Sequence, residues 1–144
     1  MIENIFARQI GRCAALGQSL QILLVDDDPL QANIRKSILE KRFSGVLRVA
    51  DAAEALCLVE QAQFAGSLGL VISAHHPAGI GGPAFVAELH TRMPSLPVLV
   101  LGGSREDRGQ YSGENDWFLP RPFLAEEMLN MVARILDQRE RKSA

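Results

Sequence analysis

Short apolar runs alternating with helix-like patterns constrain the fold of this chain more than any other feature. Each run has the length and composition of a buried strand, and the runs fall at residues 22–25, 46–50, 68–72, 97–101 and 117–119. The segments between them place apolar residues at helical spacing. This alternation predicts an α/β fold of the (βα)5 type, a doubly wound, parallel, five-stranded sheet with helices on both faces.

Turn and capping residues indicate where the helices begin. Asp28 precedes Pro29 and is expected to be the N-cap of the first helix. The apolar stripe of that helix is expected to contain Leu30, Ile34, Ile38 and Leu39. Asp51 and Glu54 have the spacing of a capping box for the second helix, a single helix whose apolar stripe is expected to run from Ala55 to Ala62. Residues 104–115 have little apolar periodicity, so the fourth helix is expected to be short or eroded, whereas residues 123–139 predict an amphipathic helix.

The chain divides into an extension, one domain and a tail. In residues 1–20, helical spacing of apolar residues predicts an extra helix; the residues are Ile2, Ile5, Phe6 and Ile10. A docked or frayed extension is favoured over a dimer arm, because chain termini are usually loosely held. Residues 21–140 form the expected domain, and residues 141–144 a polar tail. Cys13 and Cys57 lack metal-like spacing, and Cys57 is expected to be buried among apolar neighbours.

Composition excludes several classes of function. The net charge of −2 gives no indication of nucleic-acid binding. No apolar run approaches the roughly 20 residues of a membrane span, and the first residues make a poor signal peptide. A cytoplasmic protein is therefore expected.

Three acids, Asp26, Asp27 and Asp28, follow the first predicted strand. The carboxyl ends of parallel strands are where open α/β sheets bind ligands. Adjacent carboxylates repel one another, so a cation or a basic side chain must hold them together. Acid clusters of this kind commonly hold Mg²⁺ for phosphoryl chemistry.

The order of these motifs resembles the receiver domain of two-component response regulators over residues 21–138. The resemblance is carried by the acidic first strand, residues 49–56, Pro77 with Gly81, residues 97–101, and Arg121-Pro122-Phe123 in place of the family's Lys-Pro-Phe. It implies a flavodoxin-like receiver fold and a cis peptide bond at Arg121–Pro122. It also implies a signalling partner, either a histidine kinase or an output protein, and allows a homodimer.

The resemblance places the family's phosphoacceptor aspartate at Ser73, or at Ala74 if the strand is matched instead. Neither residue is a carboxylate, and no Asp or Glu occurs between Glu60 and Glu88. An acyl phosphate needs a carboxylate nucleophile, and a serine hydroxyl without a neighbouring base is a weak substitute. The acceptor position is therefore interpreted as degenerate.

Other positions implied by the resemblance have changed as well. Gly102 replaces the hydroxyl residue after the fourth strand, Phe118 stands at the aromatic switch position, and Arg121 stands at the lysine position. Arg121 is expected to bind Asp26 or Asp27 permanently. These two acids would then attract Mg²⁺ weakly at most, and no cofactor is required.

Two loop features leave alternatives open. His75 and His76 are expected to be exposed loop residues rather than metal ligands with Asp27, and His90 a surface residue. Tyr111 and Trp117 are either exposed partner contacts or, for Trp117, part of the packing against the last helix.

The favoured hypothesis is a pseudo-receiver, a non-enzymatic signalling module controlled by protein contacts rather than by phosphate. One alternative is a receiver that uses a non-standard acceptor such as Ser73 or Asp27. A third hypothesis is a phosphatase of the haloacid-dehalogenase type with Asp26 as nucleophile and Asp28 as acid and base. It is disfavoured because Leu30 stands where that family has Thr or Val and no downstream acidic pair is present.

Overall fold

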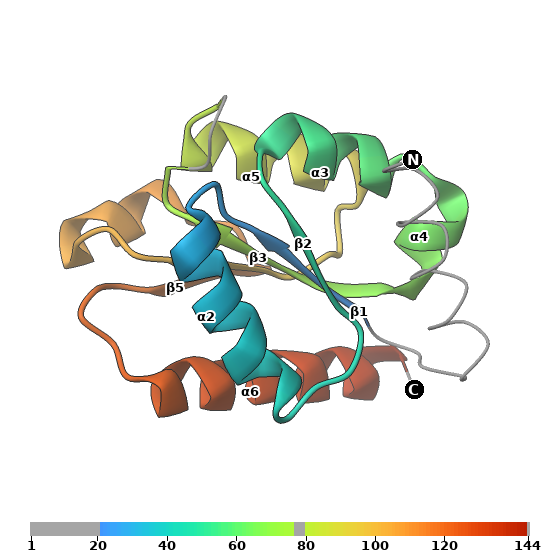
Figure 1. Ribbon diagram of the computed structural model, residues 1–144. Coiled ribbons are helices and arrows are strands. Elements are labelled where there is room, and N and C mark those ends of the chain that lie inside the picture. Colours follow the sequence, from blue (N-terminus) through green and yellow to red (C-terminus); the bar gives the residue numbers. More distant parts are fainter. Residues whose placement is uncertain (1–20, 77–79, 144) are drawn as a thin grey trace.

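All five predicted strands pair in parallel in the computed structural model, in the order β2-β1-β3-β4-β5 (Figure 1). The structure describes residues 21–76 and 80–143. The strands are β1 (Gln21–Val25), β2 (Val46–Val49), β3 (Leu68–Ala74), β4 (Val98–Leu101) and β5 (Asp116–Leu119). The predicted doubly wound α/β sheet is confirmed. The chain outside the described residues includes the expected N-terminal helix, Cys13 and Pro77.

Helices cover both faces of the sheet (Figure 1). On one face lie α2 (Pro29–Glu40) and α6 (Ala125–Ser143), and on the other α3 (Ala52–Val59), α4 (Ala62–Ser67) and α5 (Gly82–Arg92). Between β4 and β5 the chain forms only a 3₁₀ helix, η1 (Arg105–Gln110). The predicted erosion of the fourth helix is therefore confirmed. Helix α6 continues through the residues assigned to the polar tail as far as Ser143.

Burial on both faces explains why the strands read as unbroken apolar runs. In β1, Leu23 and Val25 face the core under α3 and α5, whereas Ile22 and Leu24 face the core under α2 and α6. Burial of one such side chain contributes about 1.5–3 kcal/mol relative to exposure. Among the described residues no helix is long and apolar enough to cross a membrane.

The predicted helix caps are present. The Asp28 side chain accepts hydrogen bonds from the backbone N–H groups of Leu30 and Gln31, at 3.1 and 3.2 Å. The Asp51 side chain accepts the N–H of Glu54 at 2.8 Å. The Glu54 carboxylate accepts the N–H of Ala50, not that of the N-cap Asp51, so the capping box is shifted by one residue.

The predicted apolar stripe of α2 is only half right, because Leu39 is buried and Ile38 packs partly buried against the core, but the other two residues do not. The buried residues of this helix are Ala32, Arg35 and Leu39, whereas Leu30 and Ile34 are 72% and 52% exposed. Ion pairing of Arg35 with a buried carboxylate fixes the helix with this polar side chain inward. Hydrophobic periodicity alone could not predict that rotation, because it counts arginine as an outward residue.

Two expectations for α3 are also wrong. Cys57 is exposed rather than buried, since the inward positions of this helix belong to Ala55, Leu58 and Val59. The single helix expected here ends at Val59, and α4 begins at Ala62.

Candidate functional site

The carboxyl ends of the strands surround a hollow of about 280 Å³. Residues from four strand ends line it and include Asp26, Asp27, Ala74, Gly102 and Arg121. The structure therefore brings most of the predicted site residues together. Ser73 and Phe118 do not line this hollow, because both side chains are buried within the fold.

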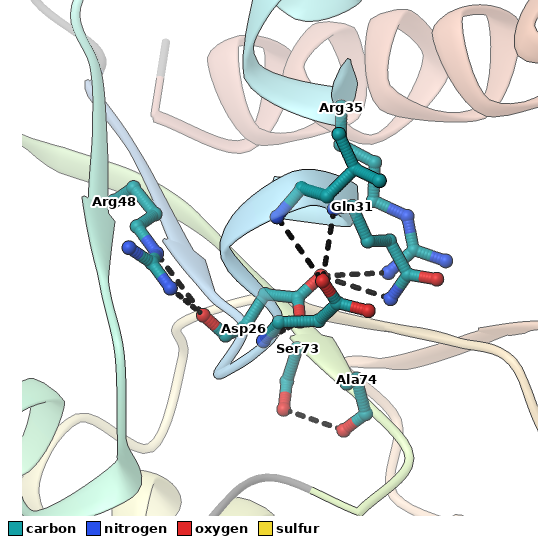
Figure 2. Close-up of polar contacts among 8 residues, drawn as sticks. Asp26, Gln31, Arg35, Arg48, Ser73 and Ala74 are labelled. Carbon is teal, nitrogen blue, oxygen red and sulfur yellow. Dashed lines mark hydrogen bonds and ion pairs between the residues drawn. The ribbon is translucent and has the colours of Figure 1, made fainter. Parts of the chain in front are cut away.

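Asp26 is a buried carboxylate whose two oxygens are bound by the protein itself (Figure 2). Its Oδ1 atom accepts the backbone N–H of Asp28 at 3.0 Å. Its Oδ2 atom accepts Nε2 of Gln31 and Nη1 of Arg35, each at 3.1 Å. With 1% exposure, this carboxylate depends on these three donors for its solvation.

Arg35 is the cation that compensates Asp26. Burial lowers the pKa of the Arg35 guanidinium, and the charge of Asp26 opposes that shift. The guanidinium also lies over the Phe123 ring, 5.6 Å from its centroid. A buried ion pair of this kind costs desolvation energy to form, but loss of one partner leaves an uncompensated charge. The pair is therefore a structural requirement of the site.

Arg48 holds the backbone at the same point. Its Nε and Nη2 atoms donate to the carbonyl oxygen of Asp26 at 3.0 and 2.7 Å (Figure 2). The Asp26 N–H in turn donates to the Val49 carbonyl at 3.1 Å. Side chain and backbone of Asp26 are thus fixed from α2 and from β2.

The expectation that Arg121 pins the acids is wrong. Among the described residues Arg121 forms no ion pair with Asp26 or Asp27, and its side chain is exposed. Arg35 already occupies Asp26, and the positive charge of Arg121 lowers the pKa of Arg35 further. Gly102 adopts a φ of +96°, a conformation that disfavours a side chain at the position where the resemblance implies a hydroxyl. The predicted cis peptide bond at Arg121–Pro122 is confirmed.

Ser73 points its hydroxyl into the protein. The side chain is 1% exposed, and its Oγ donates to the carbonyl oxygen of Ala74 at 2.8 Å (Figure 2). No general base lies within hydrogen-bonding distance of this hydroxyl among the described residues. Ser73 is therefore neither accessible nor activated as a nucleophile.

The donor set does not fit a tightly held Mg²⁺ ion. Mg²⁺ prefers near-octahedral oxygen coordination. Asp26 already accepts three hydrogen bonds, and exposed Asp27 makes no hydrogen bond or ion pair with the described residues. Within residues 21–76 and 80–143 there is no group of three or more His, Cys, Asp and Glu side chains placed to hold a metal.

A buried aromatic cluster lies beside this pocket and corrects two expectations. His75 is 5% exposed rather than a solvent-exposed loop residue, and its Nδ1 atom lies 2.7 Å from the Tyr111 hydroxyl. Tyr111 is also buried, so it is not an exposed partner contact. Its ring stacks on Phe118 with centroids 5.6 Å apart. Phe118, at the implied switch position, is enclosed by both rings.

Electrostatics explain the protonation of this cluster. Burial lowers the pKa of His75, and the neighbouring His76 lowers it further. Burial raises the pKa of Tyr111 to about 12. In neutral His75, Nδ1 can accept a hydrogen bond from the Tyr111 hydroxyl while Nε2–H faces Asp107 Oδ2, 3.5 Å away. The cluster therefore joins the end of β3 to η1.

Several site residues were missed in the sequence. Arg35 lies three residues after Ala32 and four before Leu39 on the inward face of α2, but hydrophobic periodicity counts an arginine as an outward residue and so gave no signal for it. Tyr111 gave no comparable signal, because its segment lacks periodicity. His90 is more than a surface residue, since its Nε2 atom lies 2.9 Å from the Leu96 carbonyl oxygen. Trp117 packs against the core under α6, as its second interpretation predicted.

Comparison with known proteins gives consistent similarities. The C4-dicarboxylate transport transcriptional regulatory protein DctD of Pseudomonas aeruginosa is 31% identical over 123 residues, which cover 83% of this chain and 26% of that protein. The chain thus spans about a quarter of the length of this curated relative. No family model matches the chain.

Solved structures of two further proteins superpose well. The signal receiver domain of an HD domain-containing protein from Pseudomonas fluorescens Pf-5 has a TM-score of 0.75 and 25% identity, and the match covers 88% of this chain and 93% of that one. A CheY-like response regulator receiver domain protein from Methanospirillum hungatei JF-1 has a TM-score of 0.72 and 23% identity, covering 86% and 99%.

Proposed function

We propose that this response-regulator receiver domain signals through protein contacts without being phosphorylated, and that it spans residues 21–138. One observation carries the proposal: the site residue Asp26 is neutralised by the chain's own Arg35, 3.1 Å away. A receiver that accepts phosphate needs its acids free to take a metal ion. Here the cation is a side chain, so the pocket has no need of Mg²⁺.

The acceptor position supports the same proposal. Ser73 is buried, and its hydroxyl is bound to the Ala74 carbonyl. A hydroxyl in this state cannot attack a phosphodonor without a base and a rearrangement of β3. Asp26 and Asp27 bind Mg²⁺ weakly at most, and the proposed activity requires no cofactor.

The aromatic cluster supports independence from phosphate in a second way. Phe118 packs against both His75 and Tyr111, so its position does not rely on a hydroxyl after β4, where Gly102 stands. We propose a signalling protein as the partner, either a histidine kinase or an output protein, recognised in this one conformation. The module has no enzymatic activity of its own in this proposal.

Intact-mass spectrometry after incubation with Mg²⁺ and acetyl phosphate tests the proposal. We expect no phosphoryl adduct, while a competent receiver domain in the same reaction gives one. Asp27→Asn is the matched variant, because Asp27 is the exposed carboxylate of the pocket. A metal-dependent adduct that Asp27→Asn abolishes would instead support a non-standard acceptor. Turnover of a phosphate ester that depends on Asp26 would support the phosphatase alternative.

A further inference from the structure

Exposed apolar side chains gather around one groove between α2 and the start of α6. The large hydrophobic residues exposed in the described chain are Leu30, Ile34 and Leu124, at 72%, 52% and 69%. Leu30 and Ile34 line a groove of about 400 Å³, and Leu124 adjoins its wall at Phe123. A segment with apolar side chains seated in this groove would cover Leu30 and Ile34.

The groove has an ion-paired arginine in its lining and an exposed carboxylate at one end. Its floor contains Phe123 under the Arg35 guanidinium, which Asp26 holds in place. Exposed Asp28 lines the groove, and two exposed acids follow its lining residue Ala125 in α6, namely Glu127 and Glu126, of which Glu126 lies 3.7 Å from Arg42 Nη2. A segment that fits this surface needs an apolar stripe and positive charge.

Residues 1–20 of the same chain meet both requirements. Their stripe of Ile2, Ile5, Phe6 and Ile10 has the spacing of one helix face, and Arg8 and Arg12 supply positive charge. We propose that residues 1–12 dock this stripe into the groove between α2 and α6 of their own domain, which we call the α2–α6 groove. The inference does not depend on whether the domain is phosphorylated.

The geometry of the chain allows this docking. Helix α2 ends at the same edge of the sheet where β1 begins, because Ile22 N–H bonds to the Gly45 carbonyl at 3.0 Å. The ten residues 11–20 can span up to ~33 Å when extended. A helix over residues 2–10 is about 13 Å long, shorter than the roughly 18 Å of the 12-residue α2. The segment therefore reaches the groove without leaving its own domain.

Paramagnetic relaxation enhancement in the full chain tests the proposal. A spin label on Cys13, in a Cys57→Ser background, is expected to broaden the amide signals of Leu30, Ile34 and Leu124 at every protein concentration. The matched control carries the label on exposed Cys57 of α3, in a Cys13→Ser background, and should leave these amides sharp because α3 lies on the opposite face. Adding Ile5→Asp and Phe6→Asp to the Cys13-labelled chain should restore the sharp signals.

A groove variant tests the other half of the contact. Ile34→Asp changes an exposed residue, so the domain should fold and the broadening from Cys13 should be lost. Absence of broadening in the parent chain, or broadening that survives both sets of substitutions, would overturn the proposal. Broadening of isotope-labelled chains by separate spin-labelled chains would also overturn it, by showing that a second copy occupies the groove.

Discussion

At the scale of single residues, Arg35 determines the charge of the acidic pocket, because it neutralises the buried carboxylate of Asp26. The resemblance to receivers drew attention to Arg121, but the cation that reaches Asp26 comes from the first helix after β1. Two guanidinium groups cannot both approach one buried carboxylate without repelling each other. Once Arg35 is in place, Arg121 remains exposed and unpaired with the acids.

Removing the buried cation should be costly. We expect Arg35→Ala to lower the free energy of unfolding by about 3–5 kcal/mol, because Asp26 would stay buried without its ion-pair partner. Arg121→Ala is the matched control and should change it by less than about 0.5 kcal/mol, as for an ordinary surface substitution. Urea unfolding measures both values. Similar losses for the two variants would contradict the assignment.

The titration of His75 gives a second test at this scale. Burial lowers its pKa below the ordinary value of 6.5, so the unfolded state takes up a proton before the folded state does as pH falls. Stability contributed by neutral His75 is complete above pH 6.5 and is lost as pH falls below that value. An NMR titration of the His75 ring should give a midpoint below 6.5, and a midpoint above it would show that Asp107 outweighs burial.

Among the elements, η1 is a short 3₁₀ helix at the place where the expected fold has its fourth α-helix. Reciprocal hydrogen bonds between Ser104 and Asp107 begin it, and the Ser104 N–H lowers the pKa of Asp107. Tyr111 then anchors its end in the cluster with His75 and Phe118. A short polar element is thus held by one buried aromatic residue.

Gly82 makes room for that anchor. A Cβ atom at Gly82 would collide with the Tyr111 hydroxyl and the His75 carbonyl oxygen. We expect Gly82→Ala to destabilise the domain by about 1–3 kcal/mol, the usual range for overpacking. Gly66→Ala, inside α4, is the control, because a Cβ atom there meets no atom within 4 Å. This substitution should stabilise the domain by up to about 1 kcal/mol. Thermal unfolding measures the stability of both variants. Equal changes in the two melting temperatures would contradict the close packing inferred at Gly82.

The elements show what the sequence could and could not predict. Strands buried on both faces leave continuous apolar runs, and caps such as Asp28 act through local hydrogen bonds, so both were predictable. The rotation of α2 was not, because it depends on an ion pair between residues 26 and 35 that periodicity ignores. The buried Tyr111 was also missed, since its partners His75 and Phe118 come from other elements.

For the whole molecule, the Arg35–Asp26 ion pair predicts that divalent cations do not change the stability of the fold. A ligand that binds only the folded state, present at a concentration equal to its Kd, adds about 0.4 kcal/mol. We therefore expect the melting temperature to be the same in low-millimolar Mg²⁺ and in EDTA. Differential scanning fluorimetry measures this, with Asp27→Asn as the variant that removes the exposed carboxylate. A rise with Mg²⁺ that Asp27→Asn abolishes would show a metal site at that residue.

The Arg35 guanidinium beside Asp26 also determines how easily substitutions could give the pocket a second carboxylate. Ser73 pairs with Val25, next to Asp26, so Ser73→Asp alone would place a second carboxylate near one that Arg35 already neutralises. Loss of Arg35 alone would leave Asp26 buried and uncompensated. Each single step therefore lowers stability, and the two changes are tolerable only together. A pocket with a carboxylate at position 73 is reached from this one only through less stable single variants, whichever of the two residues changes first.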